Sequence, residues 1–264
     1  MQIFSRAALN DDPAQNATSG FSLRRWWRWG GLAAFAIVST SAVAGLSFDG
    51  RNRFVMQGAR LGITIVNESN TSALAQVSVD WGEPGRADPL PIAMSKPLVK
   101  IAPKGKATVD VFYQGSGLPD DRESFLLLNV LDIPQVPRES NVLQIALRHR
   151  LKLFYRPKLK ETPEEARATL AWERSASGDE IEVHNPSPYY VTLSDMEMLG
   201  SAGRPCGEPV EHLMVAPFSS QRVKTTECQL ALLRYSVVSD AGNPLPYEAT
   251  PISGEKRYGH PENR

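Results

Sequence analysis

The chain has 264 residues, of which 42% are hydrophobic and 22% are charged. That composition is typical of globular proteins, and the length suffices for two domains of roughly a hundred residues each. Its 29 basic and 29 acidic residues give a formal net charge of zero, which argues against a nucleic-acid partner.

The N-terminal segment has the pattern of an export signal. Arg24, Arg25 and Arg28 precede an apolar run over 31–43, and small residues follow at Ala42 and Ala44. These are the three regions of a secretory signal peptide, which we predict over residues 1–44. The apolar run is short of the roughly 20 residues that a spanning helix needs, although an uncleaved anchor remains the alternative. The pattern predicts an exported protein.

From Leu46 onward the hydrophobic period is mostly two. Short segments of strand-forming residues recur about every ten residues, separated by Gly and Pro, with no long helical period. This spacing indicates an all-β protein built as a β-sandwich. The predicted strands of the first domain, which we place at 45–158, lie in 60–69, 73–81, 106–115, 123–134 and 141–157.

A change of character follows the first domain. Thr162 precedes Pro163, Glu164 and Glu165, which is typical of a helix start, so we predict a linker at 159–168 with one short helical turn. Alternating segments then resume and predict a second all-β domain at 169–252. The charged residues 253–264 predict a disordered tail.

The chain has two cysteines, Cys206 and Cys228, both in the second domain. In an oxidising compartment such a pair is a candidate disulfide, worth about 3 kcal/mol in the loop-entropy model. The alternative is two free thiols.

The segment 141–157, "NVLQIALRHRLKLFYRP", combines two properties that a single strand seldom has. Leu143, Ile145 and Leu147 share one face of an extended strand, while basic side chains such as Arg148 and Lys152 follow closely. The pattern alone leaves two interpretations open. The three apolar residues face the core of their own domain, or they are buried against another molecule.

Four motifs resemble those of one family, the periplasmic pilus-assembly chaperones of the chaperone–usher pathway. The first two are similar to the paired F and G strands of that family's first domain, and the last two to signatures of its second domain. The resemblance spans about residues 46–250. The motifs are 117–134 (GLPDDRESFLLLNVLDIP), 141–157, 185–193 (NPSPYYVTL) and 215–221 (VAPFSSQ).

The resemblance implies two immunoglobulin-like domains in an L-shaped arrangement with a cleft between them. A pilin subunit is an immunoglobulin-like fold that lacks its last strand, and the chaperone lends its G strand until an outer-membrane usher accepts the subunit. By this resemblance Leu143, Ile145 and Leu147 fill the groove of the subunit. Pilin subunits and the usher are the expected partners, with self-association as a further expectation for the subunit-free protein.

The resemblance also assigns a cationic anchor for the terminal carboxylate of the subunit. Lys152 matches the family's lysine at the foot of the cleft, and Arg53 matches its arginine on the first strand. The chain departs from the family's Asp-x-Thr-Arg pattern here, so Arg51 remains an alternative to Arg53. A guanidinium and an ammonium that converge on one carboxylate form charge-assisted hydrogen bonds. An ordinary solvated basic pair is the competing interpretation.

Two further expectations concern the same region. Glu123, Arg156 and Asp240 match the family's interdomain ion network, which would fix the angle between the domains. Lys152 and Leu147 differ in parity, so a flat strand would aim them at opposite faces. Strand twist, a bulge between residues 148 and 151, or the long lysine stem would resolve this conflict.

An enzyme is not expected. The four histidines, at 149, 184, 212 and 260, are scattered, and the sequence shows no metal-ligand spacing, phosphate loop or nucleophile elbow. We therefore predict no catalytic residue, metal, cofactor or small-molecule substrate. The rival hypothesis is an exported structural or adhesive surface protein made of two immunoglobulin-like domains. It would not need a basic residue at the end of an apolar strand.

Overall fold

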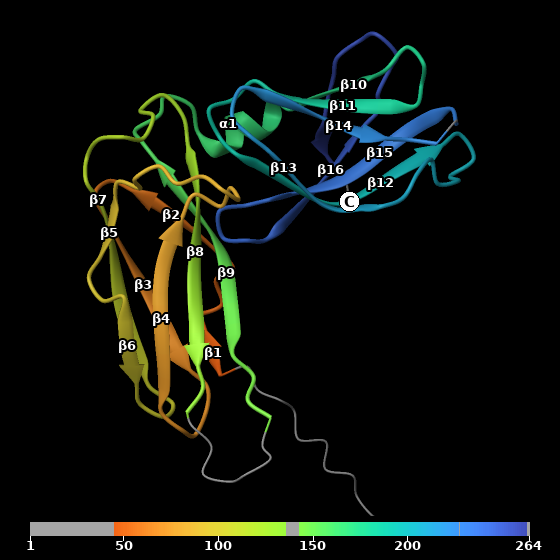
Figure 1. Cartoon of the computed structure of the whole chain (residues 1–264). Coiled ribbons are helices and arrows are strands. Elements are labelled where there is room, and N and C mark those ends of the chain that lie inside the picture. Colours follow the sequence, from red (N-terminus) through yellow and green to blue (C-terminus); the bar gives the residue numbers. More distant parts are fainter. Residues whose placement is uncertain (1–44, 136–142, 227, 263–264) are drawn as a thin grey trace, which may run out of the picture. The chain divides into compact units, whose positions relative to one another are not determined.

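The computed structural model describes residues 45–135, 143–226 and 228–262 (Figure 1). The predicted signal peptide at 1–44 lies outside these ranges. The described chain forms two β-sandwiches joined by a short segment that contains one helix. This confirms the all-β prediction and the division into two immunoglobulin-like domains.

The first sandwich packs a four-stranded sheet, in the order β1-β3-β7-β5, against a five-stranded sheet, in the order β2-β9-β8-β4-β6. All of its strand pairs are antiparallel except β2 with β9, which is parallel. Its strands are β1 (Leu46–Ser47), β2 (Arg53–Gln57), β3 (Arg60–Asn67), β4 (Ala73–Asp80), β5 (Ile92–Met94), β6 (Leu98–Ile101), β7 (Lys106–Tyr113), β8 (Ser124–Ile133) and β9 (Leu147–Arg156).

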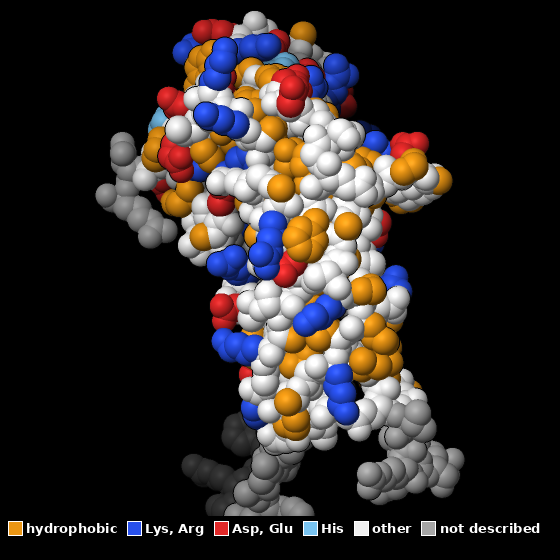
Figure 2. Space-filling model, turned by 90° about the vertical axis from the view of Figure 1, so that its left-hand side faces the viewer, with side chains coloured by type: hydrophobic (Ala, Val, Ile, Leu, Met, Phe, Trp, Pro, Cys, Tyr) orange, Lys and Arg blue, Asp and Glu red, His pale blue; other side chains and the backbone are white. Residues whose placement is uncertain are grey.

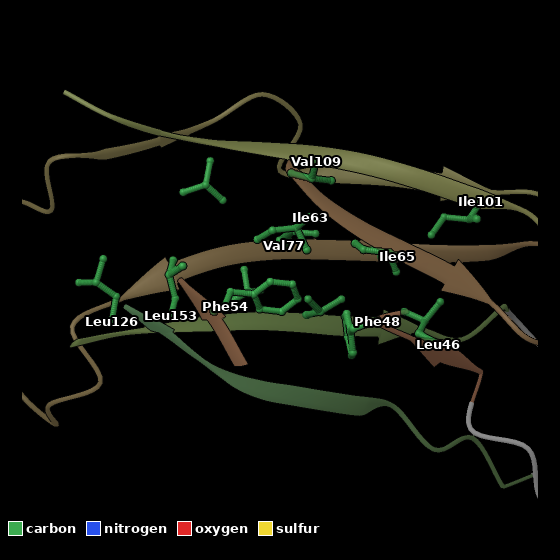
Figure 3. Packing of buried hydrophobic residues seen from close by; sticks show 14 of the residues in the cluster. Leu46, Phe48, Phe54, Ile63, Ile65, Val77, Ile101, Val109, Leu126 and Leu153 are labelled. Atoms are coloured by element: carbon green, nitrogen blue, oxygen red, sulfur yellow. The ribbon is translucent and has the colours of Figure 1, made fainter. Parts of the chain in front are cut away.

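The core of the first sandwich comes from alternate residues of these strands. Ile63 and Ile65 on one sheet meet Leu126, Leu128 and other residues on the facing sheet, and these four side chains are fully buried. Figure 3 shows such side chains pointing into the space between the two layers. The period-two pattern of the sequence therefore specified which face of each strand is buried.

The second sandwich has the same two-layer plan. One sheet has the order β14-β11-β10-β17 and the other has the order β13-β12-β15-β16-β18. Trp172 is fully buried in its core, with its ring centroid 5.1 Å from that of Tyr235. The strands are β10 (Ala171–Arg174), β11 (Glu180–Asn185), β12 (Val191–Gly200), β13 (Val210–Val215), β14 (Ser219–Lys224), β15 (Leu230–Val238), β16 (Pro244–Ala249), β17 (Arg257–Tyr258) and β18 (His260–Pro261).

Both sandwiches contain the same buried asparagine corner. In the first, the Asn67 amide donates to the carbonyls of Thr71 (2.7 Å) and Ala102 (2.9 Å). In the second, the Asn185 amide donates to those of Tyr189 (2.7 Å) and Ala216 (2.9 Å). Each asparagine therefore ties the end of one strand to the connections around it.

The helix α1 (Pro163–Ala168) lies within the predicted linker. Thr162 is its N-cap, since the hydroxyl accepts from the backbone N–H of Glu165 at 3.2 Å while the Glu165 carboxylate accepts from the Thr162 N–H at 2.7 Å. This reciprocal capping box satisfies two otherwise free donors and explains why so short a helix forms here.

The prediction of a disordered tail at 253–264 is wrong for most of that segment. β17 pairs with β10 and β18 pairs with β16, so this segment lines an edge of each sheet of the second sandwich. Charged residues and proline are frequent on edge strands, where one backbone edge faces solvent. The same composition is typical of disordered tails, and the sequence could not separate the two.

Cys206 and Cys228 form a disulfide, as predicted, with their Cα atoms 5.7 Å apart. Cys206 is buried in the core of the second sandwich. Within the described ranges no helix has the length and apolarity needed to cross a membrane. On the face drawn in Figure 2, basic, acidic and apolar side chains are interspersed, which agrees with the zero net charge.

Candidate functional site

The strand β9 has an incompletely paired edge. On one side it pairs with β8 from Leu147 to Tyr155 without interruption. On the other side it pairs with β2 only from Lys152 to Arg156. Among the strands that the structure describes, none pairs with this second edge from Leu147 to Leu151. The open N–H and C=O groups there can accept a further strand.

The three apolar residues singled out in the sequence lie at the start of this edge. Leu143, Ile145 and Leu147 are 82%, 64% and 44% exposed. Only Leu147 belongs to β9, because 143–146 have no assigned strand. The three side chains therefore do not pack into the core of their own sandwich. We call Leu143, Ile145 and Leu147 the apolar rail.

Arg53 begins β2 and lies directly opposite Lys152 in the parallel β2–β9 ladder. Its side chain is largely buried, with the guanidinium carbon 4.6 Å from the centre of the Phe154 ring. Nη1 donates to the backbone carbonyls of Val238 (3.1 Å) and Ser239 (3.2 Å) in the second sandwich. Burial lowers the pKa of Arg53, and the charges of Asp240 and Glu123 oppose this.

Lys152 has a histidine as its neighbour. Its Nζ lies 2.7 Å from Nε2 of His212, which belongs to β13 of the second sandwich. Burial and the charge of Arg53 lower the pKa of Lys152 to about 8. Among the described residues, no acidic side chain forms an ion pair with Arg53 or Lys152. Within the described part of the chain, the two cations thus form a site without an ion-pair partner.

Arg53, Lys152 and His212 line one open pocket of about 360 Å³ between the two sandwiches. Arg150 adds a further positive charge, and Asp195 is the acidic member of the lining. The buried Thr192 hydroxyl lies in the same lining and has no hydrogen-bond partner among the described residues. An anionic ligand with hydrogen-bonding groups suits this pocket.

The predicted ion network is assembled around Arg156. Its Nε donates to Glu123 at 2.6 Å, and its two terminal nitrogens donate to the Asp240 carboxylate at 2.6 and 2.8 Å. Glu123 also accepts from the Tyr190 N–H at 2.8 Å. Burial raises the pKa of Glu123 even beside Arg156. Burial would also raise the pKa of Asp240, but hydrogen bonds from Arg156 outweigh this and lower it.

The geometry bears on two alternatives that the sequence left open. Arg53 lines the pocket, whereas Arg51 is exposed and does not. The continuous β8–β9 register contains no bulge between residues 148 and 151, so that explanation of the parity conflict is wrong. Lys152 faces the pocket from the side of the sheet opposite to the buried Leu153.

Sequence reasoning missed three residues of this region. His212 has no motif around it, and in the sequence it is one of four scattered histidines. Phe154 and Tyr190 lie within quoted motifs, but nothing in the sequence indicated that their rings pack together, with centroids 5.6 Å apart. Both contacts, His212 with Lys152 and Phe154 with Tyr190, join distant parts of the chain, so no local sequence pattern could indicate them.

The fold and the site together define a class of protein. Two immunoglobulin-like sandwiches carry an open strand edge that leads into a cationic pocket, which is the architecture of a β-strand-binding protein. Two family models match the chain: the N-terminal domain of the pili and flagellar-assembly chaperone PapD over residues 52–160, and the C-terminal domain of the pili assembly chaperone PapD over residues 165–249.

Curated relatives and solved structures agree with these matches. The chaperone protein FimB/FhaD of Bordetella pertussis is 34% identical over 248 residues, covering 86% of this chain and 98% of the relative. PapD of Escherichia coli is 32% identical and covers 78% and 86% respectively. The crystal structure of the YadV chaperone is 30% identical with a TM-score of 0.66, covering 78% of this chain and 100% of YadV. This chain belongs to the PapD family of pilus-assembly chaperones.

Family membership decides between the two functional hypotheses. The chain is a chaperone of pilus assembly, a role that is not enzymatic, rather than a structural or adhesive surface protein. One structural relative, SfaE, is described as a periplasmic chaperone; it is 25% identical with a TM-score of 0.59, and the match covers 81% of this chain and 98% of SfaE.

Proposed function

We propose that this chaperone binds pilus subunits by lending them the open edge of β9 and the apolar rail. In this proposal Arg53 and Lys152 hold the terminal carboxylate of the subunit, and the loaded chaperone delivers it to an outer-membrane usher. The single observation that carries the proposal is the continuity of the site: the exposed rail and the open edge lead directly to two cations that have no ion-pair partner among the described residues.

Strand polarity supports a carboxylate as the anchored group. β2 runs parallel to β9 and begins at Arg53, where the open part of β9 ends. A subunit strand that lies on this open edge parallel to β9 would end where β2 begins, so its C-terminus would meet Arg53 and Lys152. An antiparallel strand would bring its positively charged N-terminus to the same cations, which would repel it.

The rail supplies the apolar part of the binding energy. Each of Leu143, Ile145 and Leu147 would gain about 1.5–3 kcal/mol on full burial in a subunit groove. The names of the relatives support a fimbrial partner, since YadV is described as a probable fimbrial chaperone. When no subunit is bound, we expect the same edge to favour self-association.

The test is co-expression with candidate pilin subunits, followed by purification of the complex. We expect one-to-one recovery with the wild type and loss of the subunit with Arg53→Ala or Lys152→Ala. Arg51→Ala is the matched control, because this arginine is exposed outside the pocket. Full subunit recovery with both anchor variants would overturn the anchor.

We propose further that the protein works in the periplasm after removal of residues 1–44. Fractionation followed by N-terminal sequencing of the periplasmic protein tests this. The expected N-terminus is Gly45. A membrane-bound protein that retains the apolar run of 31–43 would instead identify an uncleaved anchor.

A further inference from the structure

The Lys152–His212 contact joins the cation of the anchor to the second sandwich. A lysine ammonium has three donors and no acceptor, so at 2.7 Å the His212 Nε2 must accept from Nζ. His212 is then neutral, with its proton on Nδ1. Two N–H donors of Lys152 remain for a ligand.

We propose that His212 is a positioning residue of the carboxylate anchor: in the empty site its Nε2 accepts from the Lys152 ammonium, and when a carboxylate binds, the ammonium turns to the ligand and leaves Nε2 free to take up a proton. The inference rests on the proposed function. It adds a coupling between subunit binding and pH, which neither the rail nor the arginine provides.

The charged groups around His212 determine whether the affinity for a carboxylate increases or decreases as the pH falls. On β9 it faces Lys152 and Arg150, and on β2 it faces Arg53. On β12 it lies opposite the uncharged Ser194, and Asp195 is the single acidic neighbour in the pocket lining. Its own strand supplies Glu211, whose side chain alternates to the other face.

In the empty site these surroundings disfavour a second positive charge. Partial burial, together with the charges of Lys152 and Arg53, lowers the pKa of His212. A bound carboxylate would add a negative charge beside the ring and raise that pKa. Binding is then linked to proton uptake, so affinity increases as the pH falls through the range in which His212 titrates.

Titration of Lys152 adds a second, separate limb, at alkaline pH, to the profile of carboxylate affinity against pH. Its pKa of about 8 means that the free site loses its ammonium above that pH. Carboxylate binding would raise the pKa of Lys152 as well, so affinity decreases as the pH rises above 8. The two limbs can be separated by a variant that removes only the titration of the histidine.

The simplest probe of the anchor is N-acetylglycine, a free peptide carboxylate, with N-acetylglycinamide as the uncharged control. The carboxylate remains ionised at pH 5.5, because α-carboxyl groups have pKa values near 3.5. Binding to the wild type is measured by NMR chemical-shift titration between pH 5.5 and 9. We expect the wild type to prefer the carboxylate and to bind it up to about tenfold more tightly at pH 5.5 than at pH 7.5.

His212→Gln keeps an acceptor at a similar position but cannot titrate. We expect this variant to lose the rise between pH 7.5 and 5.5 while it keeps the loss above pH 8. His212→Ala removes the acceptor as well, so we expect weaker binding than His212→Gln at pH 7.5. His260→Gln, which alters an exposed histidine of β18, should retain the wild-type profile.

The outcomes distinguish this inference from the proposed function. A wild-type rise at low pH that persists in His212→Gln would overturn the role of His212 and leave the anchor intact. No preference of the wild type for N-acetylglycine over N-acetylglycinamide would overturn the anchor itself and the inference with it. Loss of the low-pH limb in His212→Gln alone supports both.

Discussion

The two sandwiches share their construction but differ at their edges. Each contains a buried asparagine that ties the same kind of corner, with nearly equal hydrogen-bond lengths at Asn67 and Asn185. The first sandwich leaves β9 open from Leu147 to Leu151. In the second, β17 and β18 each extend the edge of a sheet.

This difference separates two tasks within one fold. An open strand edge with exposed apolar side chains favours aggregation. Such an edge is therefore expected only where a partner protein binds and covers it. The second sandwich, which we call the closed domain because β17 and β18 each cover an edge, also has the disulfide, and it contributes His212 and Asp240 to the boundary with the first. The strand with the open edge thus lies in the first sandwich, and the second sandwich contacts it at Lys152 and Arg156.

The largest effect on stability is expected at the boundary itself. Arg156→Ala would leave the buried Glu123 carboxylate without its ion partner, which costs about 3–5 kcal/mol at pH 7. Burial already raises the pKa of Glu123, and loss of Arg156 would raise it further, so the folded state would take up a proton as the pH falls. Urea unfolding should therefore show a smaller loss at pH 5 than at pH 7.

Asp240→Asn is the matched comparison on the other side of the boundary. The Asp240 side chain is 44% exposed, so its ion pair is screened and its loss should cost less than about 1 kcal/mol. If Asp240→Asn destabilised the protein as much as Arg156→Ala, the buried half of the network would not be the dominant one.

The disulfide gives the next largest effect and belongs to the second sandwich alone. Cys206→Ala combined with Cys228→Ala removes a link across 22 residues, which should lower the free energy of unfolding by about 3 kcal/mol. Thermal unfolding of the double variant should match that of the wild type under reducing conditions. An unchanged transition would show that the closed domain does not depend on its cross-link.

Removing either buried asparagine should destabilise the protein less than loss of the disulfide, and the two substitutions should have equal effects. Asn67→Ala and Asn185→Ala each leave buried carbonyls unsatisfied, and each should cost about 2 kcal/mol. Because the two sites lie in different sandwiches, their effects should add in the double variant. A markedly unequal pair in urea unfolding would contradict the equivalence of the two corners.

Much of the fold could be predicted because β-sandwich cores follow local alternation. The period-two run at 60–69 became β3, in which Ile63 and Ile65 are fully buried, and the longer apolar run at 123–134 became β8, in which Leu126 and Leu128 are fully buried. The shortest strands were not predicted. β1 and β17 have only two residues each, too few to show a period, and they exist because a longer neighbour pairs with them.

The site was only partly predictable. Leu143, Ile145, Leu147 and Lys152 could be singled out because strand alternation and family resemblance both point to them. His212 could not, because its relation to Lys152 spans 60 residues and depends on how β13 meets β9. A histidine in an ordinary edge strand carries no local signal of such a contact.

The smallest expected effect on stability per residue belongs to the apolar rail, whose substitution should instead impair binding of the pilin. Substituting Leu143, Ile145 and Leu147 together by Ser should change the free energy of unfolding by no more than about 0.5 kcal/mol per residue, because the three side chains are exposed. Leu128→Ala, in the fully buried core of the same sheet, should cost about 2–5 kcal/mol and serves as the control. Urea unfolding measures both, and co-purification of the pilin measures function. A rail variant as unstable as Leu128→Ala would mean that these residues pack on their own sandwich, and the contrast between an open and a closed domain would fail.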